Sequence, residues 1–255
     1  GLYENYICEF IKHYSGKVKY FEVDNEPGGP PEVRAEMIRR CHRAAIRANA
    51  GAVLLGMAEV LWAGHLPNMQ KALEGAQGES IDIFSPHYLF PMCGSGYSGP
   101  GPNTHISPPE ETWGYSTGIH EILRAAEKFK LRVWNGEEGI YSSVHNAFPH
   151  AKFQDYEREV ADLATRGFLL NKSFPQIESV VLCHGIGYRK GWPGWDNPSL
   201  IVHTGFGSTV MGVQGNIKPV GVAHAVLASL IDGTKTVGWV KYPDPDTYVL
   251  VMEDE

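Results

Sequence analysis

Two glutamates at the ends of strand-like segments could together perform acid–base or nucleophilic chemistry. Glu26 follows the apolar and aromatic run 17–25 and is flanked by Asn25 and Pro27, while Glu137 ends a second such run. A run rich in Val, Tyr and Phe favours a strand, and Pro cannot donate to a ladder, so Glu26 is expected at the rim of a sheet. When two carboxyl groups converge, one can protonate a leaving oxygen while the other attacks carbon or activates water, as cleavage of a glycosidic bond requires.

Only the fold can bring these two acids together, because 111 residues separate position 137 from position 26. Strand-like runs and helical periodicities alternate between them. The predicted strands are 52–60 and 81–87, and the predicted helices are 31–49, 66–73 and 115–129. Such alternation predicts an α/β domain with a parallel sheet covered by helices. In a parallel barrel every strand ends on the same rim, so both acids can reach one ligand.

The same alternation of helices and strands continues on the N-terminal side of Glu26 and on the C-terminal side of Glu137. The predicted elements are helices 3–14, 153–171 and 219–231, strand 180–185, and a hairpin within 236–251. Residues 1–234 are expected to belong to the barrel and 235–255 to begin a β-sandwich-like domain. The Gly, Pro and Ser-rich segment 89–113 is too long for a mere connection and is expected to cover a site.

Composition narrows the kind of partner. The 255 residues carry a net charge of −7 and contain no run of Lys or Arg longer than two, which argues against nucleic acid or an anionic membrane surface. No stretch reaches the ~18 apolar residues of a membrane span. The four cysteines are scattered, form no CxxC pair and are expected to be buried small hydrophobes.

Two short motifs carry a resemblance to a known family. Asn25-Glu26-Pro27 at one strand end, followed three strands later by Gly-Glu-Glu-Gly around Glu137, is similar to clan A of the retaining glycoside hydrolases, (β/α)8 barrels such as the family 39 and family 5 members. The resemblance implies that Glu26 is the acid/base at the end of barrel strand 4 and Glu137 the nucleophile at the end of strand 7. It implies that Asn25 contacts the sugar 2-hydroxyl, that the partner is a carbohydrate, and that the protein acts outside the cell or in the periplasm.

The strand count supports this mapping and exposes a deficit. The Glu137 strand is the third after the Glu26 strand, which is the clan's interval from strand 4 to strand 7. Strands 1–3 have no counterpart in these 255 residues. A complete barrel takes about 250 residues by itself, so the chain is expected to be a partial TIM (β/α)8 barrel, strands 4–8, lacking on the order of 100 N-terminal residues.

Several further residues are candidate substrate contacts. His87 and Tyr88 end the strand before the nucleophile strand, where similar clan members place residues that bond the nucleophile or the sugar; the alternative is simple capping of a strand. His184 follows the last barrel strand in place of the Trp typical of the clan, and Trp192 or Trp195 in the next loop is a possible replacement.

Alternatives stay open at three points. Successive residues at a strand end point to opposite sides, so only one of Glu137 and Glu138 faces the barrel axis, and Glu137 fits the Glu-x-Gly pattern. No His-x-His or His-Glu-x-x-His motif favours a metal, and no cofactor is expected. A carbohydrate-binding barrel without turnover is the second function to weigh, and a metal-dependent barrel hydrolase the third.

Overall fold

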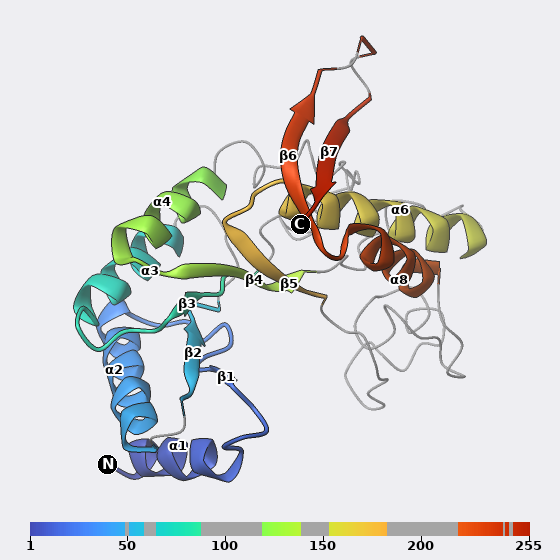
Figure 1. Cartoon of the computed structure of the whole chain (residues 1–255). Coiled ribbons are helices and arrows are strands. Elements are labelled where there is room, and N and C mark those ends of the chain that lie inside the picture. Colours follow the sequence, from blue (N-terminus) through green and yellow to red (C-terminus); the bar gives the residue numbers. More distant parts are fainter. Residues whose placement is uncertain are drawn as a thin grey trace. The chain divides into compact units, whose positions relative to one another are not determined.

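The computed structural model of the chain describes residues 1–48, 51–58, 65–87, 119–138, 153–182, 219–241, 243–244 and 247–255. It contains a sheet of five strands in the order β1-β2-β3-β4-β5 and a second sheet of two strands, β6-β7 (Figure 1). Helices alternate with the strands of the first sheet along the chain. This is the α/β organisation of a partial TIM barrel, as the sequence predicts.

The chain divides into two compact units, and the first comprises Gly1–Leu89 and Thr117–Glu137. Its elements, in chain order, are α1 (Leu2–His13), β1 (Tyr20–Glu22), α2 (Pro31–Ala48), β2 (Val53–Gly56), α3 (His65–Gly75), β3 (Ile83–Phe84), α4 (Ile119–Phe129) and β4 (Arg132–Glu138). The four helices lie on one side of these strands (Figure 1). Because helices cover that side, the opposite face of the strands is where a barrel interior would lie.

Hydrophobic spacing explains how the helices attach. In α2, Ala35, Ile38, Cys41 and Ala44 recur every third residue and are all at most 2% exposed. They form one apolar stripe, as a helix packed on a sheet requires. Leu54, Ile83 and Phe84 supply the buried strand side of this core, and Cys8 and Cys41 are buried free thiols, as the sequence predicts.

The strands of the first unit pair in parallel with regular register. Glu22 pairs with Leu55 and Leu55 with Ile83, so consecutive strands advance side by side. The end of each strand therefore arrives at one edge of the sheet, which is where Glu26, His87 and Glu137 stand. The fold thus provides the convergence that the sequence alone could only suggest.

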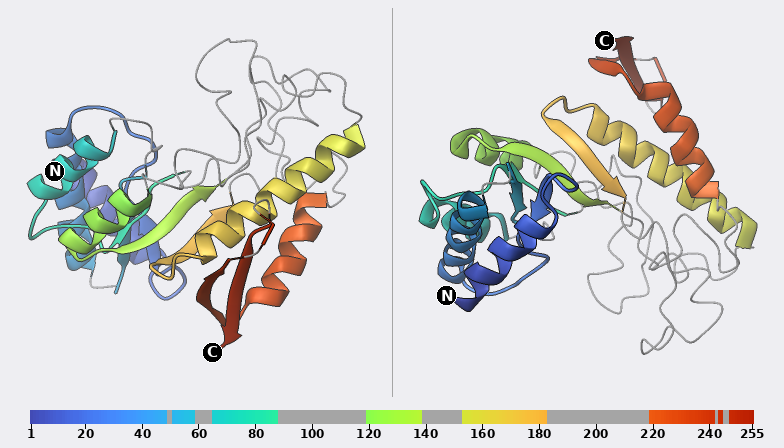
Figure 2. Two further views of the ribbon diagram at one scale, coloured as in Figure 1. Left: turned by 90° about the horizontal axis from the view of Figure 1, so that it is seen from above. Right: turned by 60° about the horizontal axis from the view of Figure 1, so that its bottom comes forward.

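The second unit comprises Phe90–Ser116 and Glu138–Glu255. Its described elements are α6 (Phe153–Lys172), β5 (Ile177–Leu182), α8 (Pro219–Ile231), β6 (Thr234–Val240) and β7 (Val249–Asp254). Helices α6 and α8 lie side by side (Figure 2), and β6 pairs with β7 antiparallel as the predicted hairpin. Thr236 Oγ1 donates to the Lys172 carbonyl, which fastens β6 to the end of α6.

The elements differ from the sequence prediction mainly at their ends. The first strand covers 20–22 rather than 17–25, because residues 14–17 form a turn after α1. The fifth strand begins at Ile177 rather than 180, since the turn after α6 is short. Within the described ranges no helix is both long and apolar enough to cross a bilayer. The proposed boundary between 234 and 235 remains a prediction.

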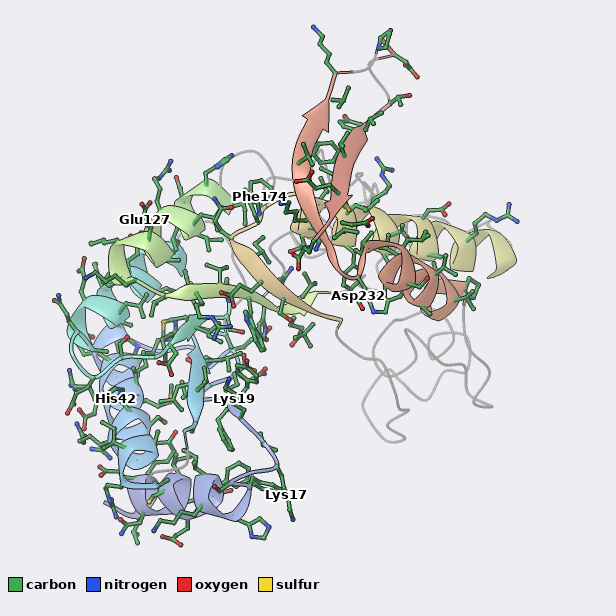
Figure 3. All side chains as sticks on the ribbon, viewed as in Figure 1. Lys17, Lys19, His42, Glu127, Phe174 and Asp232 are labelled. Carbon is green, nitrogen blue, oxygen red and sulfur yellow. The ribbon has the colours of Figure 1, made fainter. Side chains whose placement is uncertain are left out.

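A histidine outside the site shows how the helices are tied to the sheet. His42, on α2, donates from Nδ1 to the carbonyl of Ser80 at 2.8 Å (Figure 3). Ser80 lies between α3 and β3. This histidine therefore has a structural partner in the backbone before β3.

Candidate active site

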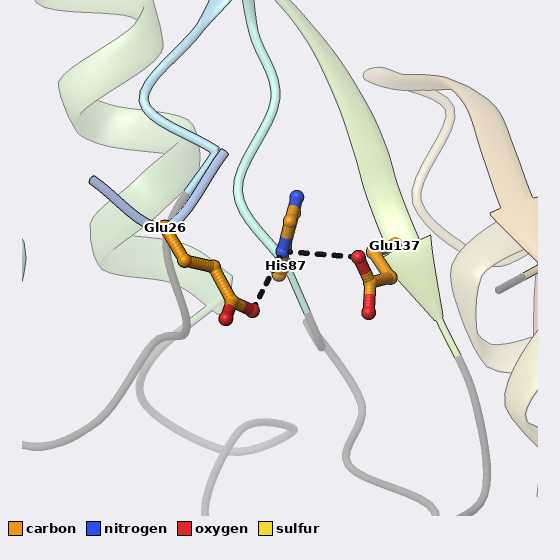
Figure 4. A group of neighbouring side chains, drawn as sticks. All are labelled: Glu26, His87 and Glu137. Atoms are coloured by element: carbon orange, nitrogen blue, oxygen red, sulfur yellow. Dashed lines mark hydrogen bonds and ion pairs between the residues drawn. The ribbon is translucent and has the colours of Figure 1, made fainter. Parts of the chain in front are cut away.

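Three titratable side chains meet at the strand ends of the first unit. Glu26 stands on the turn after β1, His87 follows β3, and Glu137 lies on β4 (Figure 4). His87 Nδ1 is 3.0 Å from Glu26 Oε1 and 3.5 Å from Glu137 Oε2. The imidazole is therefore placed between the two carboxylates, and its Nδ1–H can be donated to Glu26.

Burial of the three groups is unequal. The side chain of His87 is 1% exposed, that of Glu137 is 20% exposed, and that of Glu26 is 40% exposed. One oxygen of Glu26 and one of Glu137 lie within 4.8 Å of each other. A buried imidazole thus fixes two carboxylates that a ligand on the open side of the rim can still reach.

A one-residue shift between β3 and β4 aims Glu137 at His87. Ile83 pairs with Arg132 and Phe84 with Val133, so paired residues differ by 49 in number. Further along, His87 pairs with Glu137, and the difference is 50. One extra residue therefore lies on β4 before Glu137. Such bulges re-aim side chains beside active sites, because each inserted residue reverses the face that later residues occupy.

The backbone at Glu26 has a sterically costly conformation. Its φ is +46°, and Met57, at the end of β2, has φ +60°. Non-glycine residues in this region cost of order 1–3 kcal/mol and persist where the surroundings hold them. The Glu26 N–H donates to the Ala58 carbonyl at 2.6 Å, and the Ala58 N–H donates to Asp24 Oδ1 at 3.2 Å. Ala58 thus fastens the turn that presents Glu26.

Asp24 is a second acid in this part of the structure. Burial raises the pKa of its carboxyl, opposed by hydrogen bonds from the backbone of Ala58 and Met57 and by the charges of Arg34 and His87. Arg34 itself is 4% exposed and donates from Nε to the Gly28 carbonyl at 3.4 Å. Arg34 therefore fastens the Gly-rich turn that follows Glu26.

The structure brings together part of the predicted site. Glu26, His87 and Glu137 are adjacent, and Asn25 is exposed beside Glu26. Four other predicted contacts, Tyr88, His184, Trp192 and Trp195, lie outside the described residues. Glu138 belongs to β4, but its side chain is also outside what the structure describes.

The same three side chains are the group of His and acidic residues, within the described ranges, that could hold a cation. Imidazole nitrogen and carboxylate oxygen suit zinc and related metals. Both carboxylates are nearest to one ring nitrogen, Nδ1. With its proton on Nδ1 the imidazole donates to the carboxylates, and with the proton on Nε2 the same nitrogen could ligate a metal.

Comparison by sequence finds no matching family model and no matching curated protein. Comparison by structure finds matches among solved proteins. A family 39 glycoside hydrolase from Bacteroides cellulosilyticus has a TM-score of 0.64 and 21% identity over 99% of this chain and 48% of its own. Xylanase 10B from Thermotoga petrophila has a TM-score of 0.55 and 19% identity over 90% of this chain and 65% of its own.

A third match is GH5_18 from Streptomyces cattleya, with a TM-score of 0.57 and 15% identity over 95% of this chain and 55% of its own. The chain has a clan A-like glycoside hydrolase fold. It spans only about half to two thirds of the length of these three proteins. The resemblance inferred from the two motifs is thereby confirmed at the level of the fold.

Sequence reasoning missed three polar or small residues around the candidate site: Glu22, Ser85 and Gly136. A signal existed for two of them. In the sequence, Glu22, Asp24 and Glu26 alternate with Phe21 and Val23, a pattern that predicts one shared face of a strand. A glycine inside a strand, directly before an acid, often marks a bulge.

Proposed function

We propose that the protein hydrolyses O-glycosidic bonds of a poly- or oligosaccharide by a retaining double displacement. Glu137 is the nucleophile and Glu26 the acid/base. The observation that carries this proposal is the distance between their carboxylate oxygens, within 4.8 Å across one buried imidazole. Retaining glycosidases place the two carboxyl groups about 5–5.5 Å apart, whereas inverting ones need about 6.5–9.5 Å for an intervening water.

The chemistry takes two steps. In the first, Glu137 Oε attacks the anomeric carbon as the bond to the leaving oxygen breaks, and Glu26 gives its proton to that oxygen. In the second, Glu26 takes a proton from water, whose oxygen attacks the anomeric carbon and releases Glu137. Two displacements at one carbon restore the original configuration.

Other residues serve this reaction by holding the pair or the sugar. His87, held between both carboxylates, keeps them at working separation. Asn25 at the rim is suited to bond the sugar 2-hydroxyl. We assign the remaining sugar contacts to the predicted residues outside the described ranges, namely Tyr88, His184, Trp192 and Trp195.

The stereochemical outcome tests this proposal. When the protein, at its natural length, hydrolyses a substrate whose product anomers are resolved by NMR, the first product to accumulate is expected to have the substrate's configuration. Mutarotation then produces the other anomer slowly. Initial accumulation of the opposite anomer would contradict double displacement and point to a single attack by water.

A carbohydrate-binding barrel without turnover is the alternative. It predicts that an oligosaccharide binds while no reducing ends appear during long incubation. The buried position of His87 between two carboxylates is hard to reconcile with this alternative, because binding a neutral sugar does not require such a costly arrangement of titratable groups.

Metal removal separates the proposal from a metal-dependent hydrolase. We expect hydrolysis to be unchanged after dialysis against EDTA, because Glu26 and Glu137 supply both the proton and the nucleophile. Rates before and after dialysis, with ZnCl₂ added back as a control, give the answer. A loss restored by the metal would assign the three side chains to a metal centre instead.

A further inference from the structure

A third carboxyl group lies at the strand ends, next to the proposed catalytic pair. Glu22, the last residue of β1, accepts a hydrogen bond from Ser85 Oγ at 3.1 Å. Ser85 is fully buried and stands two residues before His87. Part of the Glu22 side chain is exposed, but its carboxyl end is fixed against this buried hydroxyl.

Gly136, on β4, packs against both Ser85 and Glu22. A methyl group at this position would lie 2.1 Å from Ser85 Oγ, 2.9 Å from the Ser85 carbonyl oxygen and 3.3 Å from Glu22 Oε1. The backbone of β4 therefore comes closer to Ser85 and Glu22 than any side chain would permit. Gly136 directly precedes Glu137 and lies in the shifted part of β4, so the contact occurs where the strand is re-aimed.

The charges around Glu22 connect it to the pair. Burial is the largest influence and raises the pKa of its carboxyl, and the neighbouring carboxylates of Asp24 and Glu137 act in the same direction. The Ser85 hydrogen bond and the His87 imidazole act in the opposite direction.

We propose that Glu22 is a positioning residue for the catalytic pair. Through Ser85 its carboxyl secures the bulge at Gly136 and so keeps Glu137 in line with His87. This inference rests on the proposed function, because it gives Glu22 a role through Glu137.

Three variants separate geometry from charge. Glu22→Leu removes the hydrogen bond and the charge, Glu22→Gln keeps an acceptor for Ser85 but removes the charge, and Ser85→Ala removes the hydrogen bond but keeps the charge. Misplacement of a reacting group by about 1 Å costs up to 10²-fold. We therefore expect kcat to fall about 10- to 100-fold in Glu22→Leu with little change in KM, less in Ser85→Ala, and least in Glu22→Gln.

The split between kcat and KM, together with rescue by the conservative variant, is the readout that a merely structural role would not move. In Glu22→Gln, which keeps an acceptor for Ser85, kcat is expected to recover most of what Glu22→Leu loses, while KM changes little in either variant. Equal kcat in wild type and in folded Glu22→Leu would overturn the proposal.

Two measurements do not depend on turnover. In a crystal structure of Glu22→Leu, we expect the Glu137 carboxylate to lie beyond ion-pair distance from His87 Nδ1. If Glu22→Leu does not fold, the crystal structure of Ser85→Ala is expected to show a smaller displacement of the same carboxylate. An unmoved Glu137 in a folded variant contradicts the positioning role even if wild type proves inactive. Absence of hydrolysis in wild type, by contrast, contradicts only the proposed function.

The stability profile tests whether the Glu22 carboxyl is buried. Because its pKa is raised in the folded state, wild type holds this proton to higher pH than the unfolded chain does. Relative to Glu22→Gln, wild type should therefore lose stability as pH rises from the ordinary value of 4.5 through the raised value, and no such loss should occur below 4.5. Urea midpoints across this range measure the difference, and a constant difference would contradict burial of the carboxyl.

Discussion

Replacement of Glu137 by Gln is expected to lower hydrolysis of an aryl glycoside by at least about 10⁴-fold, because the amide cannot form the glycosyl–enzyme bond. Gln has the shape of Glu and can still accept a hydrogen bond from His87 Nδ1, 3.5 Å from the carboxylate in wild type. The loss would therefore be one of nucleophilicity and not of packing. Initial rates at saturating substrate, with the fold checked by circular dichroism, measure it.

The matched control is Glu138→Gln, one residue further along the same strand. It removes one carboxylate from the same strand end, so an effect of net charge alone would appear equally in both variants. Only the residue facing the barrel axis can attack the sugar. A large loss in Glu138→Gln with normal rates in Glu137→Gln would transfer the nucleophile's role to Glu138.

Azide tests the same assignment chemically. In Glu137→Ala the anion can occupy the vacated space and attack the anomeric carbon once, giving a glycosyl azide of inverted configuration. Azide beside Glu26→Ala would instead attack the glycosyl–enzyme and give a retained product, since two displacements have then occurred. Identical azide products from both variants would contradict the division of roles between Glu26 and Glu137.

Much of the fold was predictable because its signal is local. Alternating strand-like and helical patterns give the order of elements, and the apolar stripe of α2 gives its buried face. Strand ends were less predictable. Residues 17–19 have strand-like composition, yet the strand starts at Tyr20, because the chain must first turn away from α1.

The candidate site was predictable where residue type and strand end coincide. Glu26 and His87 follow strands and Glu137 lies at the end of one, and a parallel sheet places such residues together. What holds them in place was not predictable. The bulge on β4 is a property of register between two strands, and register is set by packing and not by the composition of either strand. The Ser85–Glu22 hydrogen bond likewise joins residues 63 positions apart.

The second large effect is expected from Gly136→Ala. A methyl group here would stand 2.1 Å from Ser85 Oγ and 2.9 Å from the Ser85 carbonyl oxygen. Rotation of Ser85 could relieve the first contact, but the second involves backbone and requires β3 and β4 to separate. Such overpacking typically costs about 1–3 kcal/mol. Because Glu137 follows directly, its carboxylate would move away from His87, and we expect kcat to fall by about 10²-fold.

Gly75→Ala separates this site effect from crowding in general. At Gly75 a methyl group would lie 2.9 Å from the Ala35 side chain, between α3 and α2 and not at the strand ends. Gly75→Ala is expected to lower the unfolding free energy while kcat per folded molecule stays unchanged. The double variant Ser85→Gly/Gly136→Ala removes the contact with the hydroxyl, but it leaves the contact with the Ser85 carbonyl and also loses the Ser85–Glu22 hydrogen bond, so recovery of kcat should be partial. Full activity in Gly136→Ala would show that the close approach of β4 to Ser85 has no part in aiming Glu137.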